Sequence, residues 1–275
     1  MLDKPSPIGV FDSGVGGLSI LKALQAQMPH EDFVYVADSS HAPYGERDTE
    51  FVQQRAHFLL NLLRHQHDVK ALVVACNTAT AVAIQNMRSA YPELPMFGVE
   101  PAIKPAALLS HTQRVGVMAT AGTLKSEKFQ SLLQGLQTEV EFVLQACEGL
   151  ADAIEQQWHH ADNNAVSALC EKYVQAMGVF GNSVGQMDVL VLGCTHYPFA
   201  VKELRALVGP EVQIVETGAP VARHTHKVLS GHGLLRTEGE GGVQLFATGD
   251  TQNLKHAAQM WLGERQEPWH VATLA

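Results

Sequence analysis

Two cysteines, Cys76 and Cys194, lie in matching settings along the sequence. The apolar run before Cys76 is Leu-Val-Val-Ala, and the run before Cys194 is Val-Leu-Val-Leu-Gly. Each cysteine therefore ends an apolar segment and begins a polar turn, as expected at the end of a buried strand. A free thiol has a pKa of about 8.5, so one cysteine can be a thiolate near neutral pH while the other stays protonated. Such a pair could accept and return protons.

An internal similarity supports this pairing. The segment Ile8–Gly14 (IGVFDSG) resembles Val115–Ala121 (VGVMATA). The first glycines of these segments are offset by 116 − 9 = 107 residues, and the two cysteines by 194 − 76 = 118 residues. Because the two offsets nearly agree, the sequence predicts two related α/β halves, each with one thiol.

Composition narrows the class of protein. The chain of 275 residues is 46% hydrophobic, enough for two modest domains or one large domain. No apolar stretch approaches the roughly 18 residues of a membrane span, and the N-terminus has no signal core, so we expect a cytoplasmic protein without membrane contact. A net charge of −9 without a basic cluster makes nucleic acid an unexpected partner. The four cysteines form no Cys-x-x-Cys pair, which predicts reduced thiols and no metal site.

Short apolar runs alternate with longer amphipathic stretches along the chain, which is typical of strand-helix units around a parallel sheet. The expected strands are Ile8–Phe11, Phe33–Ala37, Ala71–Ala75, Met96–Val99, Arg114–Met118, Val140–Gln145, Val189–Leu192, Gln213–Glu216 and Val243–Ala247. Pro101 and Pro105 indicate a boundary between the two halves near residue 100, and Pro210 indicates a second boundary. The Gly-rich segment Ser230–Gly242 is expected to be an exposed loop.

In open parallel sheets, ligands bind beyond the carboxyl ends of the strands. The residues that follow the expected strands are polar or small, namely Asp12-Ser13, Asp38 with Pro43-Tyr44-Gly45, Cys76-Asn77-Thr78, Thr120, Cys194-Thr195-His196 and Glu216-Thr217-Gly218. These residues predict a polar rim that contains both thiols.

Several of these features also have a purely structural interpretation. A lone cysteine in such a sheet is usually a small buried hydrophobe, and we keep that interpretation for Cys147 and Cys170. The glycine-rich segment Gly14–Gly17 could bind phosphate or form a tight strand-to-helix turn. Ser19 stands where the dinucleotide pattern needs glycine, and no Gly-Lys-Ser/Thr follows. Asp12 would suit a ligand's ammonium group better than a phosphate.

Four motifs together closely resemble the bacterial glutamate racemases. They are Asp12-Ser13-Gly14, Pro43-Tyr44-Gly45, Cys76-Asn77-Thr78-Ala79 and Gly193-Cys194-Thr195-His196-Tyr197-Pro198. Their order and spacing match as well, and the likeness extends from Ile8 to the Thr248-Gly249-Asp250 turn. Agreement at four separate motifs argues against chance.

The resemblance implies an enzyme that interconverts L- and D-glutamate without pyridoxal phosphate or another cofactor, supplying D-glutamate for peptidoglycan. It implies two pseudo-symmetric, doubly wound parallel-sheet domains with the active site between them. This two-domain architecture and the two boundaries at the prolines together predict a first domain of residues 1–100 plus 210–275 and a second domain of residues 101–209. The expected substrate is glutamate, and the expected assembly is a homodimer.

The resemblance also implies roles for particular residues. Cys76 and Cys194 match the two catalytic thiols, and Asp12 and His196 match their polar neighbours, which also contact substrate. Glu155 matches an acidic residue that assists near the second thiol, although the segment before it departs from the family's usual sequence. The remaining matches to substrate-binding positions are Ser13, Pro43, Tyr44, Gly45, Asn77, Thr78 and Thr195, with Thr120 and Thr123 as additions.

Other functions remain as alternatives. The nearest is an aspartate racemase or another cofactor-independent enzyme of the same superfamily. The related aspartate racemases usually carry Glu after the second Cys-Thr, so His196 together with Pro43-Tyr44-Gly45 favours glutamate. A second alternative is a hydrolase with Cys194 as nucleophile, which would form a covalent acyl-enzyme. A third is a non-catalytic module that binds an acidic metabolite.

Overall fold

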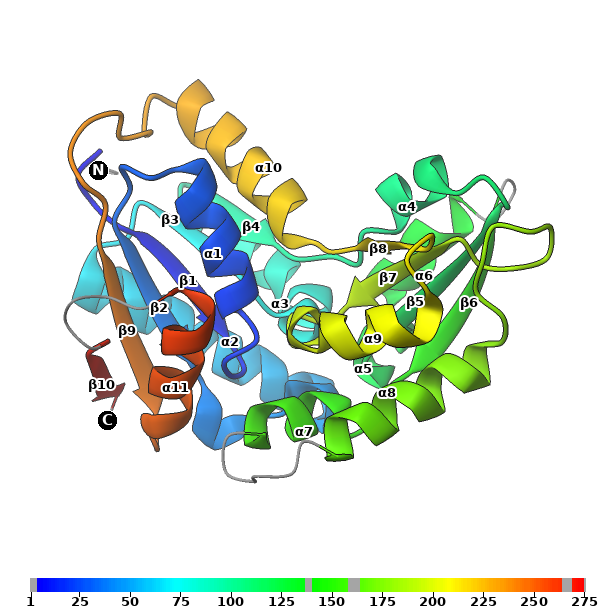
Figure 1. Ribbon diagram of the computed structural model, residues 1–275. Coiled ribbons are helices and arrows are strands. Elements are labelled where there is room, and N and C mark those ends of the chain that lie inside the picture. The colour runs from blue at the N-terminus through cyan, green and yellow to red at the C-terminus, as the bar shows by residue number, and fades with distance from the viewer. Residues whose placement is uncertain (1–3, 137–139, 158–163, 264–268, 275) are drawn as a thin grey trace. The chain divides into compact units, whose positions relative to one another are not determined.

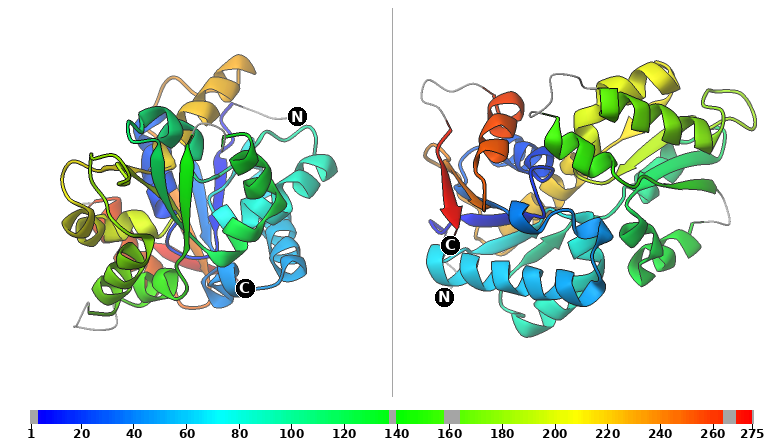
Figure 2. Two further views of the ribbon diagram at one scale, coloured as in Figure 1. Left: turned by 90° about the vertical axis from the view of Figure 1, so that its right-hand side faces the viewer. Right: turned by 90° about the horizontal axis from the view of Figure 1, so that it is seen from below.

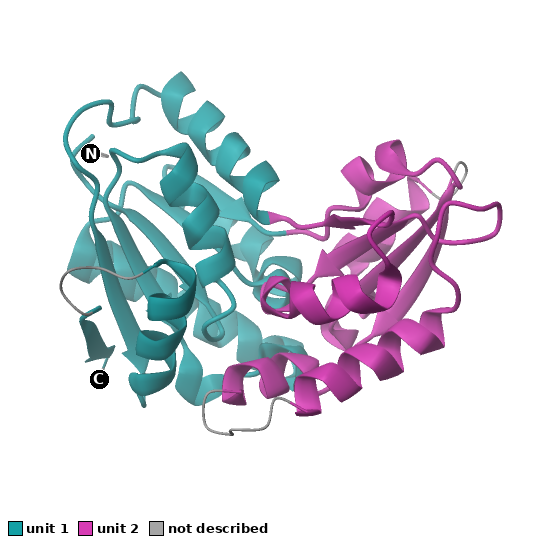
Figure 3. Ribbon diagram, viewed as in Figure 1, with its two compact units in different colours: residues 1–99, 218–275 teal, residues 100–217 magenta. Residues whose placement is uncertain are grey.

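Strands and helices alternate along the chain, as its apolar and amphipathic segments predict. A computed structural model describes residues 4–136, 140–157, 164–263 and 269–274. The chain divides into two compact units, residues 1–99 with 218–275 and residues 100–217 (Figure 3). Each unit has its own parallel sheet with helices beside it (Figure 1). The predicted α/β class with two parallel sheets is confirmed.

The first unit contains a six-stranded parallel sheet in the order β10-β9-β2-β1-β3-β4. Its strands are β1 (Ile8–Asp12), β2 (Phe33–Ala37), β3 (Ala71–Val74), β4 (Met96–Gly98), β9 (Val243–Thr248) and β10 (Val271–Leu274). The three central strands β1, β2 and β3 are buried along their whole length. Their continuous apolar sequences follow from this burial, because helices cover both faces of the sheet.

The helices of the first unit cover the two faces of its sheet (Figures 1 and 2). They are α1 (Leu18–Gln27), α2 (Thr49–His67), α3 (Asn77–Ala90), α10 (Gly218–Gly231) and α11 (Gln252–Trp261), with short 3₁₀ turns η1 (Ser39–His41) and η2 (Tyr44–Glu46). On one face, Leu59 and Leu63 of α2 and Ile84 of α3 join Val34 and Val74 of the sheet in one core cluster. On the opposite face, α1 packs against α10 and α11.

Helix α2 has clear local signals at both ends. Its N-cap Asp48 accepts a hydrogen bond from the Phe51 amide at 2.8 Å, which satisfies a free donor of the first turn. Asp68 follows the last turn in a left-handed conformation with φ 48°, a state that Asp and Asn tolerate better than most residues. Asp48 and Asp68 thus fix the limits of the helix that carries Arg55 (see below).

The second unit contains a four-stranded parallel sheet in the order β6-β5-β7-β8, which repeats the order β2-β1-β3-β4 of the first. Its strands are β5 (Arg114–Ala119), β6 (Glu141–Ala146), β7 (Val189–Gly193) and β8 (Gln213–Val215). Its helices are α4 (Ile103–Leu109), α5 (Ala121–Lys125), α6 (Glu127–Gln134), α7 (Leu150–Gln156), α8 (Asn164–Met177) and α9 (Val201–Val208), with the 3₁₀ turn η3 (Tyr197–Ala200). In the described part of the chain, no helix is long and apolar enough to cross a membrane.

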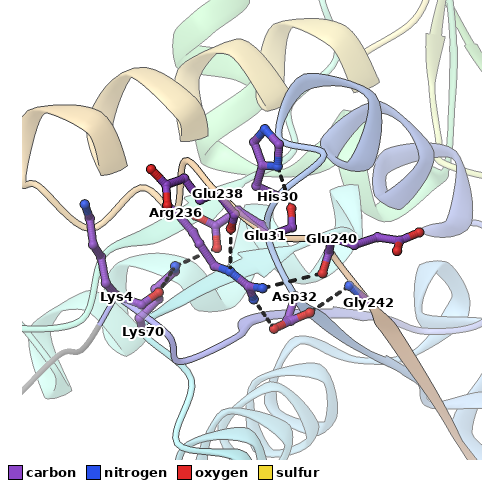
Figure 4. A network of polar contacts seen from close by, with 10 residues as sticks. Lys4, His30, Glu31, Asp32, Lys70, Arg236, Glu238, Glu240 and Gly242 are labelled. Carbon is purple, nitrogen blue, oxygen red and sulfur yellow. Dashed lines mark hydrogen bonds and ion pairs between the residues drawn. The ribbon is translucent and has the colours of Figure 1, made fainter.

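A polar network fastens the returning C-terminal segment to the first unit (Figure 4). Lys70 and Glu31 form an ion pair at 2.6 Å, and both side chains are fully buried. The second oxygen of Glu31 accepts a hydrogen bond from the Arg236 amide at 2.7 Å. The Arg236 guanidinium pairs with Asp32, whose other oxygen accepts from the Gly242 amide at 2.7 Å. These contacts lead the chain from α10 into β9, beside β2.

The nine strands expected from the sequence are all present, with boundaries that differ by at most one residue. The edge strand β10 was missed, because it is short and only half-buried and lacks a strong apolar run. Residues 213–215 were assigned to the first domain, whereas β8 pairs with β7 in the second unit and the chain returns at Gly218. Helix α10 also extends to Gly231, so the loop expected from Ser230 begins later. The predicted domains, as independently folding parts, stay a prediction.

Candidate active site

Cys76 lies at the junction of β3 and α3, where it caps the helix. Its Sγ accepts a hydrogen bond from the Ala79 amide at 3.5 Å, and the residue is 5% exposed. The N-terminus of a helix carries a partial positive charge, which favours a negative charge on a capping group. The fold therefore supports a thiolate at Cys76, whose sequence context predicted a strand-end cysteine.

An acidic group lies two hydrogen bonds from this thiol. The Cys76 thiol donates to Ser13 Oγ at 3.8 Å, and the Ser13 hydroxyl donates to Asp12 Oδ1 at 3.5 Å. Asp12 is fully buried, and its Oδ2 accepts from the Gly17 amide at 2.5 Å. Asp12 and Ser13 follow β1, which pairs directly with β3, so the sheet itself brings them beside Cys76.

The glycine-rich segment after β1 is a tight strand-to-helix turn. A Cβ atom on Gly17 would lie 2.7 Å from the Asp12 Cβ and 2.8 Å from the Tyr35 hydroxyl. The Tyr35 hydroxyl in turn donates to the Gly14 carbonyl at 2.7 Å. Glycine at position 17 is thus required by close packing. The turn amide binds the chain's own carboxylate in the place where a phosphate loop would bind its ligand.

The predicted substrate-binding segment Pro43-Tyr44-Gly45 lies in the first unit near Cys76. Tyr44 is 1% exposed, belongs to the same core cluster as Cys76, and donates to Asp38 Oδ2 at 2.5 Å. Burial and the neighbouring Asp38 charge raise the pKa of Tyr44, which keeps its hydroxyl a donor. Pro43 and Gly45 flank it and are half-buried.

Asn77 offers an acceptor to a ligand. Its side chain is buried, and its Nδ2 donates to the Val99 carbonyl at 3.3 Å. Its Oδ1 has no hydrogen-bond partner among the described residues. A buried polar atom without a partner is costly, so such an atom often has a ligand or water as its partner. Thr78, the next residue of α3, is also buried and completes the first turn.

Cys194 follows β7 in the second unit and has a different set of neighbours. Its Sγ lies 3.8 Å from His196 Nδ1, and His196 Nε2 lies 2.9 Å from Glu155 Oε1 of α7. All three side chains are buried or nearly so, as is Thr195 between the first two. The structure thus joins the three residues whose roles in the second half the resemblance implied.

The imidazole between Cys194 and Glu155 is held in its charged form. Burial disfavours the imidazolium, but the hydrogen bonds and negative charges of Cys194 and Glu155 outweigh it and raise the pKa of His196 well above its ordinary value. A doubly protonated ring donates from both nitrogens, one toward each neighbour. The charged ring therefore lies 3.8 Å from the Cys194 sulfur, within reach of a proton transfer between them.

Thr120 and Thr123 lie at the same edge of the second sheet. Thr120 caps α5, accepting from the Thr123 amide at 3.2 Å, and the two hydroxyls are 3.0 Å apart. β5 pairs with β7 so that Ala119 lies opposite Gly193, the residues just before Thr120 and Cys194. Thr120 therefore occupies the position in the second sheet that Ser13 occupies in the first.

The other two cysteines have no such setting. Burial raises the pKa of Cys147 and raises that of Cys170 to about 12, so both stay neutral thiols. Sequence reasoning missed Tyr197, which is fully buried and donates to the Cys147 carbonyl at 3.3 Å, linking the turn after Cys194 to β6. It also missed Arg55, whose contact with Asp38 no local pattern could have indicated.

The arrangement described above defines a class: parallel α/β units that each present a buried thiol with an ionisable partner at the carboxyl edge of a sheet. The model of the Asp/Glu/hydantoin racemase family matches residues 17–225. The chain belongs to this family of racemases. Its relatives are named glutamate racemase, which narrows the class to the amino-acid racemases.

Three similar proteins illustrate that relationship. The glutamate racemase of Ectopseudomonas mendocina is 42% identical over 97% of this chain and 98% of its own. A crystal structure of a glutamate racemase isoform from Bacillus anthracis is 30% identical with a TM-score of 0.86, covering 99% of this chain and 98% of that one. A glutamate racemase from Francisella tularensis, solved in complex with D-glutamate, is 25% identical with a TM-score of 0.81, covering 99% of this chain and 98% of that one.

Proposed function

We propose that this protein interconverts L- and D-glutamate by proton transfer at Cα, with Cys76 and Cys194 as the two acid/base groups. One observation carries the proposal: the two thiols follow corresponding strands, β3 and β7, in sheets of the same strand order. Each thiol has an ionisable partner within two hydrogen bonds. Relatives named glutamate racemase, one of them solved with D-glutamate, support the choice of substrate.

In the proposed reaction, the thiolate of one cysteine takes the Cα proton and leaves the electron pair of the C–H bond on Cα. The thiol of the other cysteine then gives its proton to the opposite face of Cα. The configuration inverts, and the two cysteines exchange protonation states. Proton transfer by positioned side chains contributes about 10²- to 10⁴-fold to such reactions. The reverse reaction uses the same two groups in the opposite order.

The negative charge that develops next to the substrate carboxylate needs fixed donors. The amides of Asn77 and Thr78 lie in the first turn of α3, at the positive end of the helix dipole. We infer that these amides, with Thr195 from the second unit, bind the carboxylate. The Asp12 carboxylate and the unpartnered Asn77 Oδ1 are suited to the α-ammonium. Keeping that group charged makes the neighbouring C–H more acidic.

We also infer that the D-glutamate serves peptidoglycan synthesis, which assigns the protein to the cytoplasm. Expression in a bacterial strain that requires D-glutamate for growth tests the role: growth without D-glutamate supports it. The homodimer expected from the sequence is tested by sedimentation of the purified protein.

The decisive experiment is incubation of the purified protein with L-glutamate in D₂O without pyridoxal phosphate. Loss of optical rotation together with deuterium at Cα is the expected result. The same assay with L-aspartate tests the nearest alternative, and activity on aspartate alone would reassign the substrate. A stable mass increase of the protein after substrate addition would instead indicate an acyl-enzyme and a hydrolase.

A further inference from the structure

The carboxylate of Asp38 is the centre of a polar cluster in the first unit. Asp38 directly follows β2 and is fully buried. Arg55 donates to both of its oxygens, at 2.9 Å and 2.7 Å. The hydroxyls of Tyr44 and Thr248 donate at 2.5 Å and 2.9 Å, and His41 Nδ1 lies 3.0 Å away. None of these contacts is needed to form the strand that precedes Asp38.

The partners come from separate segments of the chain. His41 lies in η1, Tyr44 in η2, Arg55 in α2, and Thr248 at the end of β9. Thr248 Oγ1 also accepts from the Ser40 amide at 3.2 Å. The cluster therefore ties residues 39–46 to α2 on one side and to the returning C-terminal segment on the other.

The cluster keeps Asp38 ionised despite its burial. Burial alone would raise the pKa of this carboxyl, but the hydrogen bonds from Arg55, Tyr44 and Thr248 and the Arg55 charge outweigh it and lower the pKa. An ionised carboxylate that accepts from a bidentate guanidinium and two hydroxyls makes strong, directional bonds. Removing its charge would therefore release several partners at once.

Two contacts link this cluster to the candidate site. The Asp38 amide donates at 2.9 Å to the carbonyl of Asp12, whose side chain reaches Cys76 through Ser13. Tyr44 packs in the same core cluster as Cys76, while its hydroxyl is held by Asp38. Asp38 is thus bonded to two residues near the first thiol, Asp12 and Tyr44.

We propose that Asp38 is a positioning residue that fixes Tyr44 and residues 39–46 beside Cys76, and that it thereby sets the affinity for substrate. The proposal deepens the glutamate racemase function proposed above and rests on it for the substrate. Asp38 acts through Tyr44 and does not itself contact the reacting atoms.

Asp188 of the second unit is a matched control. It is 4% exposed and accepts from Ser110 Oγ at 2.6 Å, from the His111 amide at 2.6 Å, and from the Thr112 amide and hydroxyl at 3.1 Å and 2.9 Å. It lies just before β7, whereas Cys194 follows β7, so the two residues lie at opposite ends of the same strand. Asp188→Asn removes the same charge from a buried carboxylate that accepts four hydrogen bonds from neutral donors, and it does not touch the candidate site.

The first test compares the kinetics of L-glutamate racemisation in Asp38→Asn and Asp188→Asn. For Asp38→Asn we expect KM to rise about tenfold or more, with a smaller change in kcat, since lost positioning weakens binding. For Asp188→Asn we expect an unchanged KM at a comparable loss of thermal stability. Equal effects of the two variants on KM would overturn the proposal. If Asp38→Asn fails to fold, Thr248→Val can be used instead. It removes one donor to Asp38 and should also raise KM, but by less than the tenfold expected for Asp38→Asn.

A double variant tests whether Asp38 acts through Tyr44. Once Tyr44→Phe has removed the hydroxyl, adding Asp38→Asn should raise KM little further, because residues in one network are not additive. Fully additive effects would mean that Asp38 influences binding by another route and would contradict the proposal.

Hydrogen exchange separates this proposal from the proposed function. Amides within residues 39–46 should exchange faster in Asp38→Asn than in the wild type, and should be unchanged in Asp188→Asn. Unchanged exchange in Asp38→Asn would overturn the positioning role whatever the activity. If the wild type does not racemise glutamate but the exchange differs as expected, the proposed function fails and the positioning of residues 39–46 stands.

Discussion

The two thiols occupy equivalent strand ends but have opposite kinds of ionisable partner. In the first unit, Cys76 reaches the Asp12 carboxylate through the Ser13 hydroxyl. In the second unit, Cys194 lies against the His196 ring, whose raised pKa keeps it positively charged, with Glu155 behind it. The repeated strand order therefore places the two sulfurs at equivalent strand ends. The ionisable residues around each sulfur differ and influence its charge.

The difference in neighbours indicates how two cysteines can have different chemical roles. The charged imidazole lies beside Cys194, whereas a carboxylate lies two hydrogen bonds from Cys76 and can accept its proton through Ser13. The proposed reaction requires one thiolate and one thiol, because a proton is removed on one face of Cα and returned on the other. The end of α3 moderates this contrast, because its amides favour negative charge on Cys76.

The largest effect should come from removing either sulfur. Cys76→Ala and Cys194→Ala should each lower kcat for racemisation by at least about 1,000-fold, because each removes one of two indispensable acid/base groups. Polarimetry with L-glutamate measures the loss. Cys170→Ala, which alters a buried cysteine of α8 outside both sites, should keep its activity. Full turnover by either single variant would rule out the two-thiol reaction.

Replacing the imidazolium should have the next largest effect. His196→Gln removes the positive charge beside Cys194 and should lower kcat about 100-fold. The folded pKa of His196 lies above the unfolded value of about 6.5, so its contribution to stability is complete below that pH and is lost as pH rises through the raised pKa.

Urea unfolding of the wild type and His196→Gln, between about pH 6 and about pH 9, measures this dependence. The stability advantage of the wild type should shrink as pH rises. A difference that stays constant with pH would show that folding does not raise the pKa of His196.

The carboxylate behind His196 should matter less than the ring itself. Glu155→Gln keeps the size of the side chain but removes the charge that helps to raise the pKa of His196. We expect kcat to fall about tenfold, in line with the loss of one charge-assisted hydrogen bond. The alkaline loss of the His196 contribution to stability should move to lower pH. Glu171→Gln, an exposed change in the same unit, should leave both properties unaltered.

The smallest effect should come from the hydroxyl between Cys76 and Asp12. Ser13→Ala breaks two long hydrogen bonds and should lower kcat several-fold, consistent with about 0.5–1.5 kcal/mol for one neutral hydrogen bond. Ser131→Ala on the exposed face of α6 is the matched control. If Ser13→Ala matched the effect of His196→Gln, the two thiols would depend on their partners equally, and the contrast drawn above would be wrong.

Particular elements show how far the sequence alone could lead. The central strands were predictable because burial on both faces requires a continuous apolar run, as in Leu72–Val74. β10 was not, since an edge strand needs no such run. The placement of β8 was also missed, because a strand's sequence does not state which sheet it joins.

The sequence by itself determined that two cysteines end equivalent apolar strands, and which racemase family they resemble. It could do so because strand burial and short motifs are local properties of the chain. Only the tertiary structure decided the partner of each group: Glu155 meets His196 across 41 residues, and Thr248 meets Asp38 across 210. Hydrogen bonds over such separations depend on how strands and helices pack, and no local pattern encodes that packing.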